Sequence, residues 1–384
     1  MAIWRRLAIG VVGVAILAAG YGARHDVHGW TLVFRAANGQ GVLRRLADLD
    51  TVPIRERLIA IPVRDASLRA RVYAPSGAAR QTVLLVSGLH PAGIDEPRLV
   101  DLARKLAQAG VLVVTPDIPE LSRFEITPRL TDRIEDAATW LANTPQLAPS
   151  GRIGLMGISF SGGLAMVAAG RPGLRDRLLY VFSLGGHDDL LRVLGYFCTG
   201  IEAEPWPHRG LPPHDYGVAV VLLNVAEDLV PPEQVAPLTV AVRDFLRASS
   251  LDALDKAEAN RLFASLRARA GTLPEPAGTL LGYVNNRDVA HLGPLLMPFV
   301  GRYASAPALS PARSPLASAP AYLLHGRDDN VIPSSESGRL AERLGGRARL
   351  LVSDLISHAD ADQPADALSV WKLAHFWGDL LDQS

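Results

Sequence analysis

A serine on a sharp strand-to-helix turn is the feature of this sequence best suited to chemistry. After Arg152 the chain is apolar to Ile158 and reaches the turn Gly157-Ile-Ser159-Phe-Ser161, and an alanine-rich helical pattern follows directly. A serine at such a turn has a strained backbone, which is sterically possible only when the residues two before and two after it are small. Gly157 and Ser161 satisfy that condition. We therefore expect an exposed Ser159 hydroxyl at a strand end, with the Phe160 N–H facing a reacting oxygen.

A second serine competes for the same role. Ser161 also lies in a string with a small residue on each side, formed by Ser159 and Gly163. We favour Ser159, because it lies closer to the end of the apolar strand and leaves Gly162 and Gly163 for close packing of the helix. The same turn also occurs without chemistry, so the interpretation depends on partner residues.

Two segments near the carboxyl terminus carry residue types that a serine nucleophile needs. A serine hydroxyl is a poor nucleophile at neutral pH and requires a base, which a carboxylate orients. Residues 324–333 read Leu-His-Gly-Arg-Asp-Asp-Asn-Val-Ile-Pro after an apolar run. Residues 355–360 read Leu-Ile-Ser-His-Ala-Asp and contain His358, the only histidine between the last predicted strand and the closing helix.

The serine turn and these loops resemble the alpha/beta-hydrolase superfamily, in its dienelactone-hydrolase-like and esterase branches, over about residues 58–186 and 320–376. A His-Gly-x-x-Asp-x-x-x-Pro type loop carries the acid in that superfamily, so the resemblance implies Asp329. It also implies that His358 is the base.

The same resemblance assigns the donors of an oxyanion hole. The Phe160 N–H is one donor, and the resemblance implies that the Leu89 N–H is the second. This sequence has Ser87-Gly88 where the superfamily has a His-Gly pair. His90 follows and either contacts the substrate or packs beneath Pro91.

Other acidic and basic residues leave alternatives open. Asp188 and Asp189 follow the strand after the serine turn, and either one would serve in place of Asp329. We expect Asp328 to point to solvent or into a turn, and His325 to support the turn as a structural residue.

Alternating strands and helices must position these residues. Buried apolar runs that alternate with amphipathic helices predict an α/β fold: a doubly wound, mostly parallel sheet of the alpha/beta-hydrolase type with an inserted helical cap. Ligands bind at the carboxyl ends of strands in such sheets. The first two predicted strands form an antiparallel lead-in. The expected strands are residues 58–63, 68–73, 82–86, 111–115, 152–158, 178–184, 321–324 and 348–352.

The expected domains follow from where the alternation stops. Residues 24–189 and 316–384 form the two parts of a hydrolase core, and residues 190–315 form the helical cap. Within the cap we expect helices over residues 190–197, 235–246 and 252–270. Residues 24–57 show only a weak hydrophobic pattern, and we assign no function to them.

The amino terminus has the composition of a targeting segment. Trp4-Arg5-Arg6 precedes an apolar run over residues 7–19, and residues 20–23 could extend it to a spanning length. Residues 1–23 are therefore an export signal or an N-terminal membrane anchor. This predicts a location in the cell envelope and contact with a membrane through this segment.

Composition limits the other partners. Of 384 residues, 39 are basic and 39 acidic, so no global field attracts nucleic acid, and a neutral or hydrophobic small substrate fits better. Cys198 is the only cysteine, which excludes an intrachain disulfide and favours a packing role. No metal-binding or nucleotide-binding motif is present, so we expect no cofactor.

These observations predict a serine hydrolase that cleaves an ester or related acyl bond through Ser159, His358 and Asp329. Two alternatives remain open: an acyltransferase with the same triad, and a non-catalytic binding protein with this fold. The sequence leaves the oligomeric state open.

Overall fold

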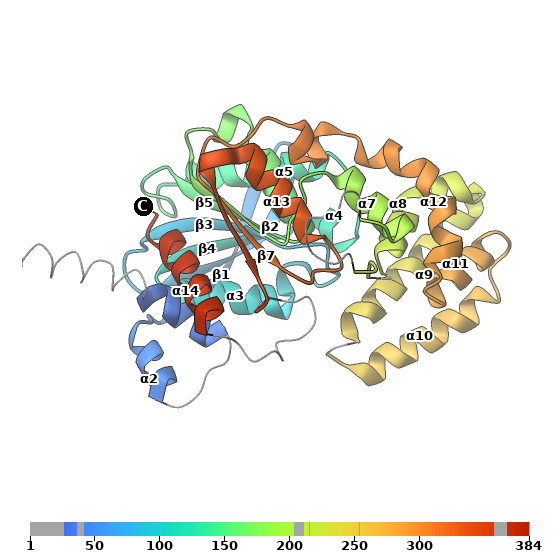
Figure 1. Ribbon diagram of the computed structural model, residues 1–384, viewed down its shortest axis with the longest axis horizontal. Helices are drawn as coiled ribbons and strands as arrows, with labels where there is room; N and C mark the ends of the chain where they lie inside the picture. Colours follow the sequence, from blue (N-terminus) through green and yellow to red (C-terminus); the bar gives the residue numbers. More distant parts are fainter. Residues whose placement is uncertain are drawn as a thin grey trace, which may run out of the picture.

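A mostly parallel sheet forms the centre of the protein. The computed structural model describes residues 27–36, 42–202, 211–214, 216–252, 254–356 and 367–383. Within these residues the sheet has eight strands in the order β1-β2-β4-β3-β5-β6-β7-β8 (Figure 1). The β1–β2 and β2–β4 pairs are antiparallel, and the other pairs are parallel. The strands are β1 Ile54–Val63, β2 Ala66–Pro75, β3 Gln81–Val86, β4 Val111–Pro116, β5 Ile153–Ile158, β6 Leu178–Leu184, β7 Ala321–Gly326 and β8 Ala348–Ser353.

Helices cover both faces of this sheet (Figure 1). On one face lie α3 (Pro97–Gln108) and α14 (Ala367–Leu381); on the other lie α5 (Arg129–Ala142), α6 (Phe160–Ala169) and α13 (Ser334–Leu344). Successive strand residues point to opposite faces and helices cover both, so the central strands are apolar at most positions. All residues of β3, β4 and β7 are buried. The predicted fold class is therefore confirmed.

Short elements connect these layers. They are α4 Pro119–Ser122 and the 3-10 turns η1 Gly93–Asp95, η2 Pro172–Leu174, η3 Pro307–Leu309, η4 Pro311–Arg313 and η5 Gly345–Arg347.

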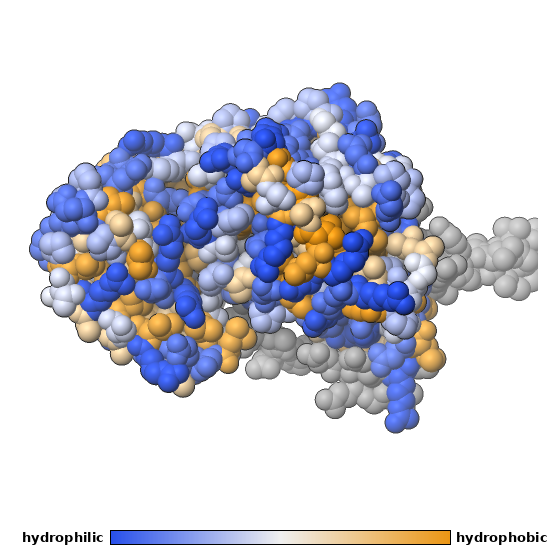
Figure 2. Space-filling view, turned by 180° about the vertical axis from the view of Figure 1, so that it is seen from behind, coloured by the Kyte–Doolittle hydropathy of each residue, from blue (hydrophilic) through white to orange (hydrophobic). Residues whose placement is uncertain are grey.

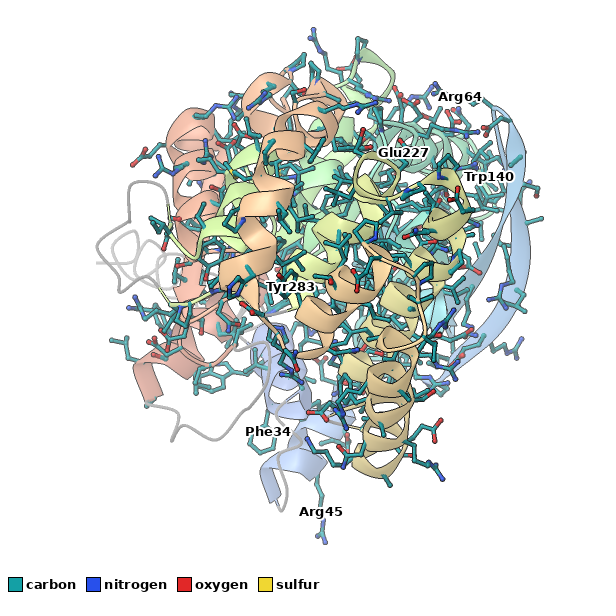
Figure 3. All side chains as sticks on the ribbon, turned by 90° about the vertical axis from the view of Figure 1, so that its right-hand side faces the viewer. Phe34, Arg45, Arg64, Trp140, Glu227 and Tyr283 are labelled. Carbon is teal, nitrogen blue, oxygen red and sulfur yellow. The ribbon has the colours of Figure 1, made fainter. Side chains whose placement is uncertain are left out.

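A group of helices lies between β6 and β7 in the sequence and beside the sheet in space (Figures 1 and 3). Their buried apolar residues belong to the same cluster as those of α5 and α6, so the helices pack on the core rather than forming a separate one. The helices are α7 Leu190–Thr199, α8 Tyr216–Leu229, α9 Pro232–Leu251, α10 Lys256–Ala270, α11 Ala277–Asn285 and α12 Val289–Ala304.

Three of these helices were not predicted from the sequence, for identifiable reasons. Helix α8 is buried at nearly every position between Gly217 and Ala226, so it has no polar stripe that would reveal a helical period. Helix α11 is short and mostly apolar. Helix α12 contains Pro294 and Pro298, which normally argue against a helix interior.

Helical residues precede the sheet, in a stretch whose weak pattern predicts no element. Residues 27–36 are helical, and α2 spans Val42–Leu49. A Cβ at Gly29 would overlap the carbonyl of Ala374, so the first helix lies directly against α14. In the described part of the chain no helix is long and apolar enough to cross a membrane. The predicted targeting segment, residues 1–23, lies outside the described residues.

Candidate active site

The predicted strained turn is present at Ser159. Strand β5 ends at Ile158, Ser159 has φ +54° and ψ −128°, and α6 begins at Phe160. A Cβ at Gly157 would overlap the backbone of Ser161, so only glycine fits there. The Ser159 N–H donates to the Leu184 carbonyl at 2.6 Å, which ties the turn to the end of β6. A positive φ costs a serine about 1–3 kcal/mol, and such strain occurs where the surrounding fold enforces it.

The two serines of the turn have different environments. Ser159 is partly exposed, whereas Ser161 is completely buried and its hydroxyl has no hydrogen-bond partner in the described part of the chain. A Cβ at Gly163 would overlap the ring of His187, and one at Gly162 would overlap Ser183. The two glycines therefore allow α6 to pack closely, and of the two hydroxyls only that of Ser159 can meet a substrate.

The loop after β3 lies directly beside Ser159. A Cβ at Gly88 would lie 3.2 Å from the Ser159 Cβ and 3.2 Å from the Ile158 carbonyl oxygen. Leu89, the next residue, is partly buried. Because the first N–H groups of a helix lack intrahelical acceptors, the Phe160 N–H at the start of α6 is an available donor. The structure thus places Gly88, the residue before Leu89, directly beside the Ser159 turn, from which α6 begins at Phe160.

His90 is occupied by its own turn. Its Nδ1 accepts a hydrogen bond from the Ala92 N–H at 3.2 Å. Burial lowers the pKa of His90, and the Glu96 carboxylate opposes that shift. The side chain is partly buried. Among the described residues, no hydrogen bond joins His90 to Ser159.

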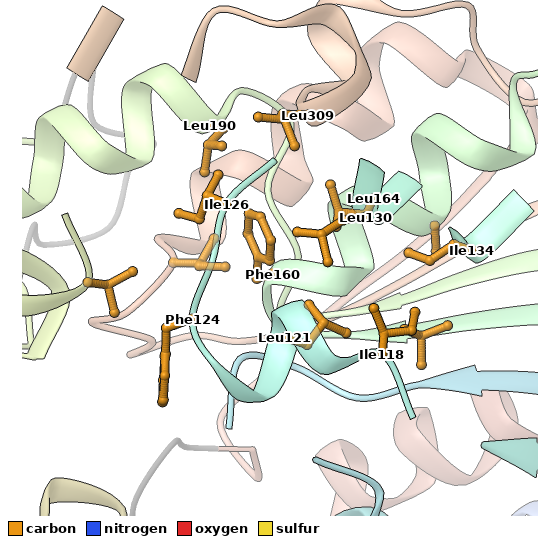
Figure 4. Close-up of a cluster of buried hydrophobic side chains, with 14 of the residues drawn as sticks. Ile118, Leu121, Phe124, Ile126, Leu130, Ile134, Phe160, Leu164, Leu190 and Leu309 are labelled. Carbon is orange, nitrogen blue, oxygen red and sulfur yellow. The ribbon is translucent and has the colours of Figure 1, made fainter. Parts of the chain in front are cut away.

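A buried histidine that the sequence did not identify stands behind the turn. The rings of His187 and Phe160 stack with their centroids 5.4 Å apart. His187 Nε2 donates to the Leu309 carbonyl at 2.7 Å, and burial lowers the pKa of the ring. Figure 4 shows the Phe160 ring among Ile126, Leu190 and Leu309. Phe160, whose backbone borders the Ser159 hydroxyl, is therefore fixed by its side chain.

The Asp329 carboxylate lies at the end of β7 and is held by its own loop. Its Oδ1 accepts hydrogen bonds from the Val331 N–H at 2.9 Å and the Ile332 N–H at 3.0 Å. Its Oδ2 faces the turn after β6, 3.3 Å from the position of a Cβ on Gly185. Asp329 is 7% exposed, whereas Asp328 is exposed as expected.

His325 supports this loop, as the sequence predicts. The imidazole is completely buried. Its Nε2 donates to the Ile332 carbonyl at 2.8 Å and lies 3.4 Å from Asp329 Oδ2, and its Nδ1 lies 2.6 Å from Ser337 Oγ. These contacts connect the acid loop to α13.

The alternative acids, Asp188 and Asp189, are engaged elsewhere. Asp188 Oδ1 binds Arg343 at 2.6 Å and its Oδ2 binds Arg192 at 3.0 Å. Asp189 Oδ1 accepts from the Leu191 N–H at 2.9 Å and caps α7, and its Oδ2 lies 3.2 Å from Arg313.

Glu336 completes this network. Its Oε2 accepts the N–H groups of Asp188 and Asp189 at 2.9 and 2.8 Å, and its Oε1 accepts from Arg192 at 2.8 Å. Asp188 therefore joins the end of β6 to α7 and α13 through Arg192 and Arg343, and Asp189 joins it to η4 through Arg313. Both carboxylates are thus engaged by arginine rather than by a histidine.

The predicted base, His358, lies outside the described residues. The chain before it is placed: a Cβ at Gly326 would overlap the carbonyl of Ile356, so Ile356 lies against the end of β7. The Arg327 N–H also donates to the Ser353 carbonyl at 3.0 Å. The segment that contains His358 therefore begins beside the Asp329 loop.

A second strained residue borders the helical insertion. Phe124 has φ +59°, which is unusual for a bulky side chain. The Asn224 amide of α8 holds this turn: its Nδ2 donates to the Phe124 carbonyl at 2.9 Å, and its Oδ1 accepts from the Ile126 N–H at 2.8 Å. One side chain thus fastens the segment after β4 to the insertion, a feature without a sequence signal.

In the described part of the chain no three histidine, cysteine, aspartate or glutamate side chains gather to hold a metal ion. The candidate site consists of Ser159, the neighbouring backbone N–H groups and the Asp329 loop.

The strand order, the antiparallel β2 and the serine turn between β5 and α6 define an alpha/beta-hydrolase fold. No family model matches the chain, and neither does any curated protein.

Solved structures similar to the chain include three enzymes. An esterase from Pyrobaculum calidifontis has 18% sequence identity and a TM-score of 0.45, over 94% of this chain and 91% of the other. A dienelactone hydrolase from Anabaena variabilis has 17% identity and a TM-score of 0.41, over 85% and 96%. Carboxyl esterase 2 from Tuber melanosporum has 13% identity and a TM-score of 0.47, over 86% and 85%.

Proposed function

We propose that the protein is a serine hydrolase that cleaves an ester or related acyl bond of a small molecule. The observation that carries the proposal is Ser159, a partly exposed serine at positive φ with the Gly88 loop directly against it. Backbone strain is common at active sites, and here it presents a hydroxyl beside backbone N–H donors that could stabilise an oxyanion.

The proposed reaction begins with attack of Ser159 Oγ on the acyl carbon, while His358 takes the hydroxyl proton. The N–H groups of Leu89 and Phe160 stabilise the oxyanion. The intermediate collapses, the bond to the leaving group breaks, and His358 returns the proton to that group. Water then attacks the acyl carbon and His358 takes its proton; the bond to Ser159 Oγ breaks, His358 returns the proton to Oγ, and the carboxylic acid leaves.

Asp329 and His358 have different support. Two backbone N–H groups hold Asp329 Oδ1, while Oδ2 faces the turn after β6 and lies 3.4 Å from His325 Nε2. The buried carboxylate is thus fixed at the end of β7, where it would orient an imidazole. His358 is assigned by its place in the sequence, two residues after Ile356.

Labelling with a fluorophosphonate probe tests the nucleophile. We expect the wild-type protein and Ser161→Ala to be labelled and to hydrolyse short acyl esters, and Ser159→Ala to do neither while retaining its melting temperature. Labelling of Ser159→Ala contradicts the assignment. An unlabelled and inactive wild-type protein indicates a binding protein, and transfer of the acyl group to added alcohols in place of hydrolysis indicates an acyltransferase.

A further inference from the structure

Exposed apolar side chains gather on one small part of the surface. The described chain has thirteen large hydrophobic residues that are exposed, and five of them lie on the two N-terminal helices and the first turns of α14. They include the two tryptophans that are exposed among the described residues, Trp30 at 37% and Trp371 at 45% exposure. We call these residues the tryptophan face: Val27, Trp30, Leu49, Leu368 and Trp371.

Contacts between the three helices hold these residues together. Gly29 lies against Ala374 of α14, and His28 Nδ1 lies 2.5 Å from Asp50 Oδ2, next to Leu49 at the end of α2. Figure 3 shows Phe34 and Arg45, from the two N-terminal helices, at one end of the molecule, opposite Arg64 at the tip of the β1–β2 hairpin. The tryptophan face is thus one end of the folded protein.

The exposed residues follow a helical period. Val27, Trp30 and the partly buried Phe34 are spaced i, i+3 and i+7, so they form one stripe of helix 27–36. The other side of this helix is occupied, since Leu32 is buried and Arg35 Nη2 donates to Gln108 Oε1 at 2.6 Å. One apolar side of this helix packs on the core and a second apolar stripe is exposed to solvent. Exposed apolar patches of this kind indicate contact with a partner or a membrane.

Basic side chains accompany this face. Arg45 of α2 and Lys372 of α14 are exposed, and Lys372 directly follows Trp371 in the chain. The exposed Asp48 of α2 lies 3.4 Å from Arg35, and this arginine neutralises part of the negative charge of the Asp48 carboxylate. On the side shown in Figure 2, hydrophilic and hydrophobic residues are interspersed, with a group of hydrophobic residues near the middle.

The chain itself indicates what covers the tryptophan face. Only residues 20–26 separate the apolar run over residues 7–19 from Val27, and these seven residues extend at most about 25 Å. If that run inserts into a bilayer, helix 27–36 stays within about 25 Å of the membrane surface. Tryptophan prefers the boundary between lipid and water, and exposed basic residues favour anionic headgroups.

We propose that the tryptophan face lies on an anionic lipid bilayer and fixes the orientation of the protein there. This inference rests on residues 7–19 acting as a membrane anchor and is independent of the proposed hydrolase activity. The protein is then held at the membrane in one orientation rather than on a free tether.

Quenching of tryptophan fluorescence by brominated lipid tests the contact. The full chain is reconstituted into vesicles of phosphatidylcholine and phosphatidylglycerol with bromine on the upper acyl chains. We expect strong quenching in the wild-type protein and a loss of at least about half of it in a Trp30→Phe, Trp371→Phe variant. Trp140→Phe is the matched control, because Trp140 lies on α5 across the sheet, and it should leave the quenched emission unchanged.

Placement of single thiols gives an independent measurement, since Cys198 is buried. A polarity-sensitive maleimide dye on Leu368→Cys should shift to the blue when vesicles are added, and the same dye on Leu295→Cys, exposed at 44% on α12 of the helical insertion, should not. Equal quenching in the double variant and the Trp140→Phe control, or equal shifts at both thiols, overturns the proposal. A vesicle-independent shift at Leu368→Cys with a doubled mass in solution assigns the face to a second copy of the chain instead.

Discussion

Gly88 lies against Ser159 so closely that a Cβ at position 88 would be 3.2 Å from the Ser159 Cβ. This separation is tighter than ordinary side-chain packing, so the loop after β3 and the serine turn are fitted to each other. Glycine at position 88 is what allows the proposed Leu89 donor to approach the proposed nucleophile.

Gly88→Ala should therefore reduce activity more than stability. The methyl group must displace either the loop or the turn by a few tenths of an ångström, and we expect kcat/KM for an ester to fall by at least about 10-fold. Gly282→Ala is the control, since a Cβ there meets nothing within 4 Å. Equal activity of the two variants would contradict the fitted arrangement.

A comparison of Asp329→Asn with Asp188→Asn should show which aspartate is the acid of the reaction. In Asp329→Asn the amide oxygen can still accept the Val331 and Ile332 N–H groups, but the negative charge is lost, so kcat should fall by about 10³–10⁴-fold with little change in melting temperature. Asp188→Asn should have the opposite effect. Because the contacts to Arg192 and Arg343 are weakened, the free energy of unfolding should fall by about 1–3 kcal/mol, while kcat stays near the wild-type value. Loss of turnover in Asp188→Asn alone would reverse the assignment.

His187 should make the folded protein sensitive to acid. Burial lowers its pKa in the folded state, so below the ordinary histidine value of about 6.5 the unfolded chain takes up a proton that the folded protein does not. The free energy of unfolding therefore falls as the pH decreases below about 6.5, by at most about 1.4 kcal/mol per pH unit from this residue. In denaturant titrations between pH 7.5 and 5, His187→Asn should show a shallower fall than the wild-type protein. An unchanged slope would exclude His187 as the source.

Asn224→Leu should destabilise the junction between core and insertion. The change leaves the Phe124 carbonyl and the Ile126 N–H without their partner while Phe124 remains at positive φ, so the free energy of unfolding should drop by about 2–4 kcal/mol. Asn286→Ala, at an exposed helix end, should cost less than about 0.5 kcal/mol. Similar losses in chemical denaturation would mean that the Asn224 contacts add no stability.

Cys198 should react only when the protein opens. Burial raises the pKa of its thiol to about 12, so little thiolate exists at neutral pH and reagents cannot reach it. Labelling by a maleimide should be negligible over hours in buffer and complete within minutes in denaturant. Rapid labelling of the folded protein would show that helix α7 opens locally.

Local sequence by itself determined the strands, the serine turn and the acid loop. Continuous apolar runs such as those of β3 and β4 predict strands buried on both faces, and the strain at Ser159 requires small neighbours that the sequence displays. These features depend on residues within a few positions of each other. Asp329, too, is bound by N–H groups only two and three residues away. His358 remains a prediction from sequence position.

Tertiary structure alone decided which similar residues differ in role. Ser161 and Ser159 are two residues apart, yet only contacts with distant segments bury the first and leave the second partly exposed. By sequence, Asp188 and Asp189 are also candidates for the acid. In the structure they are bound by Arg343, Arg313 and Glu336, all more than 120 residues away in the chain. The docking of helix 27–36 on α14 is equally invisible in the sequence, because such contacts join segments whose spacing along the chain carries no period.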